Sequence, residues 1–241
     1  MNRTSTAVRS WTAADVERYA AAVGGTGVLP TFAITIAQFG GPQVDLGADL
    51  TQTLHAEQSL TLHGELPLEG TVEVTRTITD VFDKGSGSLI VCRWDAVGDA
   101  RFSTGASLFV KGAGGFGGPR GTTTRDPVPD REPDVSLTFR TAPNQADRYR
   151  LTGDENRLHW DAEFAARAGF PRPILHGLAT FGITARLLDL DTASISARFT
   201  QPVFPGDELQ VNAWHEECGV RFRTSVEGTV VINDGRATPS S

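Results

Sequence analysis

Two short patterns occur twice in this sequence, in the same order. Glu17-Arg-Tyr19 resembles Asp147-Arg-Tyr149, and Thr31-Phe-Ala-Ile-Thr35 resembles Thr180-Phe-Gly-Ile-Thr184. Each pair is followed by several segments with the composition of β-strands. A repeat that keeps its order predicts a chain of two related halves, and 241 residues are enough for both halves to have a core.

The local patterns divide the chain in the same way. Thr12 and Asp15 suit a helix start, and apolar residues at Val16, Tyr19, Ala20 and Val23 predict a helix that ends at Gly24-Gly25. Strands are predicted at 58–63, 71–82, 88–94 and 101–110, and again at 135–140, 195–200, 208–214, 221–226 and 229–232. Between the two sets lie a glycine run and a proline-rich stretch. We therefore expect an N-terminal half at 1–111, a linker at 112–134 and a C-terminal half at 135–241.

The halves differ in the length of one interval. Tyr19 and Thr31 are 12 positions apart, whereas Tyr149 and Thr180 are 31 apart, so the second half has 19 additional residues. They contain Asp154, Asn156 and His159. A carboxylate and an imidazole held together suit general acid–base chemistry on a water molecule. Gly-Asp-x-Asn is also ordinary turn chemistry, and a histidine beside a tryptophan is often simply packed. The spacing alone leaves both interpretations open.

A second feature follows at His176-Gly177. The residues Ile174, Leu178, Phe181, Ala185 and Leu188 recur at helical spacing after Pro173, so Gly177 should lie at or near the N-terminus of a buried helix. Backbone N–H groups are unpaired there, and a glycine allows a carbonyl group to approach closely. The site could therefore act as an oxyanion hole. A tight turn into a core helix explains the same residues equally well.

The overall charge and the chain ends limit the partners. A net charge of −7 argues against nucleic acid as the main partner. No apolar run approaches the ~20 residues that span a bilayer. Because the N-terminus lacks the apolar core of a signal peptide and the C-terminus has no peroxisomal tripeptide, we expect a cytoplasmic protein. His55, His63 and His215 have no metal-binding spacing, so no metal site is expected.

Taken together, the motifs of the second half resemble the MaoC-like family of hotdog-fold hydratases. The resemblance is carried by Tyr149-x-x-x-Gly-Asp-x-Asn-x-Leu-His159, by Ala168-Gly-Phe170 and by Arg172-Pro-Ile-Leu-His-Gly-Leu178. The whole chain looks like hydratase 2, the (R)-specific 2-enoyl-CoA hydratases. The resemblance implies an α+β double hotdog fold, with two antiparallel sheets each wrapping a central helix and a degenerate first half.

The resemblance also implies roles for the residues already singled out. Asp154 and His159 would hold and activate the water, and Asn156 would orient it or the Asp154 carboxylate. The Gly177 N–H would polarise the thioester carbonyl. His55, Lys84 and Phe199 match positions that contact the CoA thioester, although Lys84 could equally be a solvated turn lysine. No cofactor is implied, because CoA is part of the substrate.

Two residues depart from the family pattern. Arg157 stands where proline is usual, so it could loosen the turn that holds Asp154 or add a charge near the substrate. Ala56 stands where glycine is usual and could shift the His55 contact. Neither change removes a catalytic group, so we expect the substrate to be affected more than the reaction.

The sequence therefore predicts a lyase that adds water reversibly to trans-2-enoyl-CoA and gives (R)-3-hydroxyacyl-CoA. The shortened first half would leave room for medium, long or bulky acyl chains. A dehydratase of acyl-carrier-protein substrates and a non-catalytic acyl-thioester-binding protein are the alternatives, and a thioesterase is a weaker one. A homodimer is plausible, although a double hotdog already completes the two-fold pair within one chain.

Overall fold

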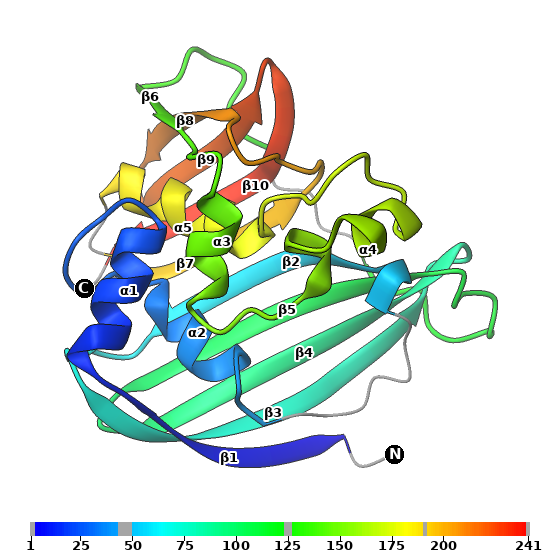
Figure 1. The fold of residues 1–241 in the computed structure, drawn as a ribbon, viewed down its shortest axis with the longest axis horizontal. Coiled ribbons are helices and arrows are strands. Elements are labelled where there is room, and N and C mark those ends of the chain that lie inside the picture. The colour runs from blue at the N-terminus through cyan, green and yellow to red at the C-terminus, as the bar shows by residue number, and fades with distance from the viewer. Residues whose placement is uncertain (1–2, 43–49, 123–126, 190–191, 240–241) are drawn as a thin grey trace.

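A ten-stranded antiparallel sheet dominates the structure, a computed structural model that describes residues 3–42, 50–122, 127–189 and 192–239 (Figure 1). The strand order is β1-β3-β4-β5-β2-β7-β10-β9-β8-β6. The strands are β1 (Thr4–Trp11), β2 (Thr53–Leu62), β3 (Gly70–Asp83), β4 (Gly87–Gly98), β5 (Arg101–Lys111), β6 (Val135–Arg140), β7 (Thr192–Phe199), β8 (Glu208–Glu216), β9 (Gly219–Val226) and β10 (Thr229–Pro239).

The sheet consists of two five-stranded halves that meet at β2 and β7. The first five strands of the chain form one half and the last five form the other. The two halves are hydrogen-bonded in one register along the seam, from Glu57 opposite Arg198 to Thr61 opposite Ser194. The expected double hotdog is thus confirmed, and its two sheets are continuous through this seam.

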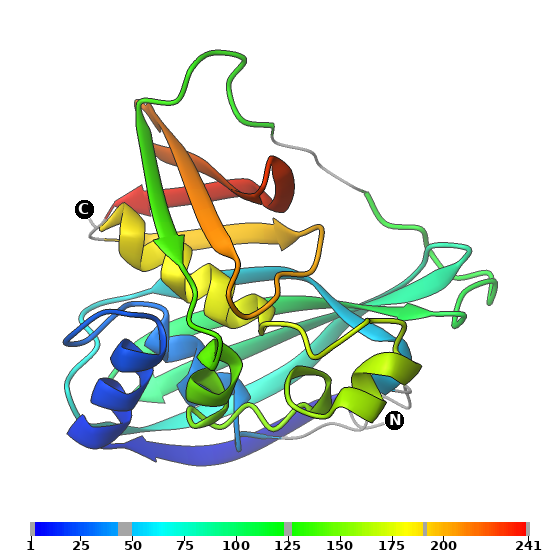
Figure 2. The same cartoon turned by 45° about the horizontal axis from the view of Figure 1, so that its top comes forward.

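The helices lie on one face of the sheet, which curves around them (Figures 1 and 2). They are α1 (Ala13–Ala22), α2 (Phe32–Gln38), α3 (Gln145–Arg150), α4 (Ala162–Arg167) and α5 (Gly177–Leu188), with short 3-10 turns η1 (Leu50–Gln52) and η2 (Arg157–His159). The repeated tyrosines pack against each other, because the ring centroids of Tyr19 and Tyr149 are 6.2 Å apart. None of the helices in the described parts of the chain is long and apolar enough to span a membrane.

The core lies between the helices and the curved sheet. Alternating residues of the long strands face it, such as Val72 and Val74 of β3, and both are buried. From the helix side, Phe181 and Ile183 of α5 are fully buried in the same cluster. Four residues of the predicted apolar stripe, Leu178, Phe181, Ala185 and Leu188, pack in or against this cluster and join α5 to the sheet, whereas Ile174 precedes the helix and belongs to a separate, smaller cluster.

Most predicted elements are present, and the differences have physical causes. The helix that starts at Thr12 has the expected capping box with Asp15. The sequence patterns do not predict β1. It is an edge strand that pairs only with β3, and because most of its residues are exposed or half-buried it has no strong apolar pattern. The 19 additional residues of the second half lie in the segment that contains η2 and α4. Between β5 and β6, the described residues form neither helix nor strand.

Candidate active site

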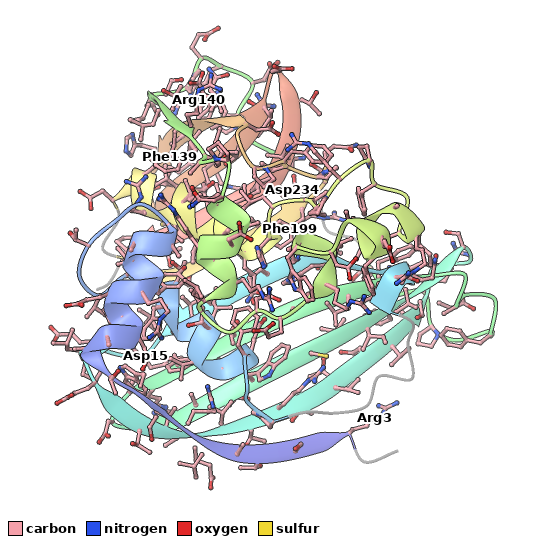
Figure 3. All side chains as sticks on the ribbon, in the orientation of Figure 1. Arg3, Asp15, Phe139, Arg140, Phe199 and Asp234 are labelled. Carbon is pink, nitrogen blue, oxygen red and sulfur yellow. The ribbon has the colours of Figure 1, made fainter. Side chains whose placement is uncertain are left out.

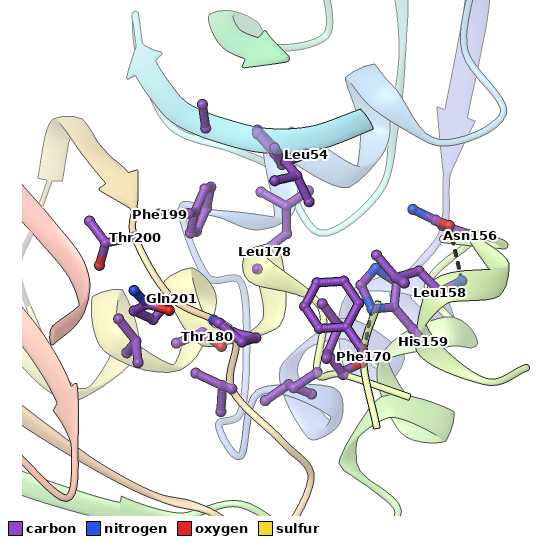
Figure 4. Close-up of a pocket in the computed structure, with 18 of the residues that line it drawn as sticks. Leu54, Asn156, Leu158, His159, Phe170, Leu178, Thr180, Phe199, Thr200 and Gln201 are labelled. Atoms are coloured by element: carbon purple, nitrogen blue, oxygen red, sulfur yellow. Dashed lines mark hydrogen bonds between the residues drawn. The ribbon is translucent and has the colours of Figure 1, made fainter. Parts of the chain in front are cut away.

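A pocket of about 420 Å³ lies where the two halves meet (Figure 4). The first half contributes Leu54 and His55 from β2, and the second half contributes Phe199 from β7. Phe199 lies near the middle of the molecule (Figure 3). β5, the turn after β7 and β10 also contribute, and much of the remaining wall comes from the N-terminal part of α5 and from the segment that the first half lacks. That segment supplies Asp154, Asn156, Leu158, His159, Phe170, Ile174 and Leu175.

The Asp154–His159 segment is a hydrogen-bonded turn. The Asp154 Oδ1 accepts from the Asn156 backbone N–H at 3.1 Å. The Asn156 Oδ1 accepts from the Leu158 N–H at 3.1 Å, as Figure 4 shows. These are the Asx bonds that the turn interpretation predicts. Both side chains nevertheless line the pocket, and Asn156 keeps its amide donors. The two interpretations are therefore compatible, because the turn is what presents the polar groups.

His159 is held in one orientation by the backbone. Its Nδ1 lies 2.9 Å from the Ile174 carbonyl oxygen. Because a carbonyl can only accept, Nδ1 carries the proton and Nε2 is left as an acceptor. Burial lowers the pKa of His159 to about 4, against the opposing effect of the Ile174 carbonyl. The imidazole is therefore neutral at neutral pH and can accept a proton from water.

Asp154 has the opposite perturbation. Burial raises its pKa to about 6, although the Asn156 N–H opposes this, and the nearby Glu155 charge adds to it. Near pH 7 the carboxylate is mostly ionised but close to its titration. One of its oxygens lies within 4.8 Å of a ring nitrogen of His159. A single water that makes two hydrogen bonds of about 2.8 Å can bridge that distance.

His176 belongs to this cluster, although its sequence context predicted only the start of a helix. Its ring is buried and stacks on the His159 ring, with centroids 3.8 Å apart and an interplanar angle of 30°. Neither ring nitrogen has a hydrogen-bond partner among the described residues. Burial, and then the neighbouring His159, hold the pKa of His176 well below its usual value, while the Asp154 backbone opposes them. The sequence signals for it were its position directly before Gly177 and its place in the motif Arg172–Leu178 that carries the family resemblance.

Asp154, His159 and His176 bring potential metal-ligand atoms within 4.8 Å of one another. The two imidazole rings are stacked face to face, however, with their planes only 30° apart. A lone pair on an imidazole nitrogen lies in the plane of its ring, so two stacked rings do not point at a common ion. This geometry suits acid–base work better than metal binding, and the metal-free site stays a prediction.

Gly177 is the first residue of α5, as expected. His176 is the N-cap, and its carbonyl accepts from the Ala179 and Thr180 N–H groups. No group among the described residues accepts the Gly177 N–H, which lies at the positive end of the helix and beside the pocket. A Cβ on Gly177 would lie 3.3 Å from the Phe199 ring. Glycine therefore keeps open the space through which an oxygen can approach this N–H.

His55 and Phe199 meet across the seam between the halves. Their rings are in edge contact, with centroids 4.9 Å apart, and both line the pocket. The His55 Nε2 bonds to the Glu57 carbonyl at 3.0 Å, and burial lowers the pKa of His55 to about 4. Ala56 lies between His55 and Glu57 in a β-bulge, where the register of β2 against β5 shifts.

Lys84 and Arg157 do not line this pocket. Lys84 borders a neighbouring hollow of about 610 Å³, which shares Ala56 and Phe109 with the pocket. The half-exposed Arg157 pairs with Asp161, the N-cap of α4. This ion pair connects η2 to α4. Arg157 therefore stabilises the turn that contains Asp154 and does not loosen it.

Comparisons with known proteins identify the relatives of this chain. A family model described as "MaoC like domain" matches residues 123–235, and one described as "MFE-2 hydratase 2 N-terminal domain" matches residues 10–112. A Mycobacterium tuberculosis protein named 3-hydroxyacyl-thioester dehydratase Y is 38% identical, over 93% of this chain and 91% of that protein. Enoyl-CoA hydratase ChsH3 from the same organism is 36% identical, over 96% and 94%. A solved MaoC-like dehydratase from Phytophthora capsici superposes with a TM-score of 0.89 at 27% identity, covering 99% of this chain and 95% of that one.

Proposed function

The chain belongs to the MaoC-like hydratase 2 family, and we propose that it adds water to trans-2-enoyl-CoA to give (R)-3-hydroxyacyl-CoA. The observation that carries this proposal is the proximity of Asp154 and His159 in one pocket, which Gly177 also lines with an N–H that no acceptor among the described residues takes up. Acid–base groups and an oxyanion donor on one pocket are what water addition to a thioester-activated double bond requires.

The chemistry can be assigned group by group. The Asp154 carboxylate and the unprotonated His159 Nε2 hold one water and accept a proton as its oxygen attacks C3. Electron density moves towards the thioester oxygen, where the Gly177 N–H and the start of α5 stabilise the developing negative charge. The proton returns to C2, so both groups are regenerated. Loss of one oxyanion donor typically slows such a reaction by ~10²–10³.

The pocket also supports a proposal for the acyl group. Away from the acid–base pair it is lined mainly by apolar side chains, including Leu54, Phe170, Leu178, Val203 and Ile232. We propose an acyl chain of medium or greater length, because apolar contacts of this kind gain affinity with each buried methylene, by about 0.8 kcal/mol. The cytoplasmic location, a homodimer and the absence of a cofactor stay predictions from the sequence.

The same groups would catalyse the reverse reaction. One relative is named a 3-hydroxyacyl-thioester dehydratase, so dehydration of 3-hydroxyacyl thioesters, on CoA or on an acyl carrier protein, is the second candidate. A non-catalytic binder has little support, because the acid, the base and the oxyanion donor all face one pocket.

The test is an assay with matched thioesters. The purified protein is mixed with trans-2-enoyl-CoA of four to sixteen carbons, and with the same acyl groups on an acyl carrier protein. Loss of the enoyl absorbance with the CoA series, fastest above four carbons, is the expected result. Turnover of the carrier-protein series alone would favour the second candidate. No turnover of either series would refute the proposed function.

A further inference from the structure

Asp83 is a buried carboxylate outside the acid–base cluster. It lies at the end of β3 and is 7% exposed. Its Oδ1 accepts from the backbone N–H groups of Gly85 at 2.8 Å and Gly115 at 2.9 Å, and its Oδ2 accepts from Gly117 at 2.8 Å. These bonds, led by the one from Gly115, hold the pKa of Asp83 below its usual value. One carboxylate thus joins its own turn to a loop about thirty residues further along the chain.

The loop that Asp83 holds is the glycine run after β5. It lies beside the β3–β4 turn in Figure 1. Gly115 and Gly117 have φ of +80° and +76°, a conformation that residues with a Cβ rarely adopt. Their added Cβ atoms would meet nothing within 4 Å. Glycine is therefore needed there for the backbone conformation that points two N–H groups at one carboxylate, and not for space.

The same interaction shapes the hollow beside the acyl pocket. From the glycine run the chain passes over Phe82, close to Gly121, and Thr122 lines the hollow. Lys84, the residue next to Asp83, also lines the hollow, and its Nζ donates to the Arg120 carbonyl at 2.6 Å. The Asp83 carboxylate therefore fixes both the turn and the loop between which the Lys84 ammonium is held.

The hollow adjoins the acyl pocket. Both are lined by Ala56 and Phe109, so the two cavities adjoin at these residues, and the hollow lies next to the pocket that would hold the acyl group. In the proposed function the part of the substrate outside the acyl pocket is the carrier arm, which bears phosphate groups. Among the described residues the Lys84 ammonium donates only to Arg120, so its two other donors suit such an anion.

We propose that Asp83 is a positioning residue for the carrier arm of the thioester. It acts through the glycine run and Lys84, and touches neither the acyl group nor the reacting atoms. The proposal rests on the proposed function, and it predicts that affinity for the carrier depends on Asp83 while the chemical step does not.

The variant that tests this is Asp83→Asn. The amide oxygen of the variant side chain can still accept the N–H groups of Gly85 and Gly115. Its N–H₂ group would face the Gly117 N–H, and because both are donors the bond to Gly117 is lost. Hydration is measured with a trans-2-enoyl-CoA and with the N-acetylcysteamine thioester of the same acid, which lacks the phosphates. We expect roughly a tenfold rise in KM for the CoA thioester with kcat little changed, and no change in either constant for the truncated thioester.

Two further variants test whether the change in KM arises from the interaction between Asp83 and the glycine run. Gly117→Ala strains the same loop without altering Asp83 and should raise KM for the CoA thioester in the same direction. Asp99→Asn is the matched control, because Asp99 also accepts a backbone N–H, from Thr71, but lies at the far end of β3 and β4. It should leave both substrates unaffected.

The outcomes separate the two proposals. A fall in kcat for both thioesters with Asp83→Asn would overturn the inference and make Asp83 a general structural support. An unchanged KM for the CoA thioester with Asp83→Asn and Gly117→Ala would also overturn it. If Asp83→Asn fails to fold, the Gly117→Ala result decides, since that glycine is exposed. Absence of hydration by the unaltered protein would refute the proposed function instead.

Discussion

At the scale of single residues, burial changes the chemistry of ordinary side chains. Asp154 and His159 lie in a largely apolar pocket, which moves their pKa values in opposite directions, to about 6 and about 4. The result is a carboxylate and a neutral imidazole that coexist near pH 7. The His176 ring stacks on the His159 ring, and its lowered pKa keeps it neutral as well. Neither of these two histidines is therefore an imidazolium beside the water that Asp154 and His159 would activate.

The pKa of Asp154 predicts how hydration depends on pH. Below about pH 6 the carboxyl group becomes protonated and can no longer accept the proton of the water. His159 stays neutral down to about pH 4, so it does not add a second loss in this range. We expect kcat/KM to be level between pH 7 and 8 and to fall about tenfold per pH unit well below 6.

The measurement is kcat/KM for one enoyl-CoA from pH 4.5 to 8. Asp147→Asn is a suitable control, because it removes an exposed carboxylate from α3 and should leave the profile unchanged. A profile that is level through pH 6 would show that Asp154 does not act as the base.

At the scale of elements, the sequence predicts the start of α5 at the residue where the structure places it. The 4-3-4-3 pattern predicted a buried helix near Gly177, and the helix begins at that residue. The pattern did not predict that the His176 ring would stack on His159, because that contact depends on how the Asp154 segment folds back. The contact of Gly177 with Phe199 depends likewise on β7. Local spacing predicts elements, whereas contacts between elements are set by packing.

The close contact at Gly177 predicts the effect of Gly177→Ala. The first turn of a helix accepts alanine, so the fold should persist. The new Cβ would lie 3.3 Å from the Phe199 ring and would narrow the path of the thioester oxygen to the N–H. We expect kcat to fall by roughly tenfold or more, with KM changed much less, because the N–H acts mainly on the charge of the transition state.

Steady-state kinetics and the melting temperature of Gly177→Ala check this expectation. The melting temperature is expected to stay within a few degrees of that of the unaltered protein. An unchanged kcat in a folded variant would contradict a role for this N–H in stabilising the oxyanion.

At the scale of the whole molecule, the division into two related halves accounts for the fold and for the place of the candidate site. The repeated patterns predicted two halves, and the structure has two five-stranded halves with paired tyrosines at their contact. The unequal intervals predicted where chemistry would concentrate, and Asp154, Asn156 and His159 do lie together on one pocket. The placement of His55 on that pocket followed only from the family resemblance. The register of β2 against β7 joins residues over a hundred positions apart, so no local pattern contains it.

The most direct test of the account is the handedness of the product, measured with the unaltered protein and with Asp154→Asn. A trans-2-enoyl-CoA of ten carbons is incubated with each protein, and the 3-hydroxyacyl product is quantified by chiral chromatography. The account predicts an (R) product from the unaltered protein and a loss of at least about 10² in rate for the folded variant. An (S) product, or a variant that hydrates as fast as the unaltered protein, would contradict it.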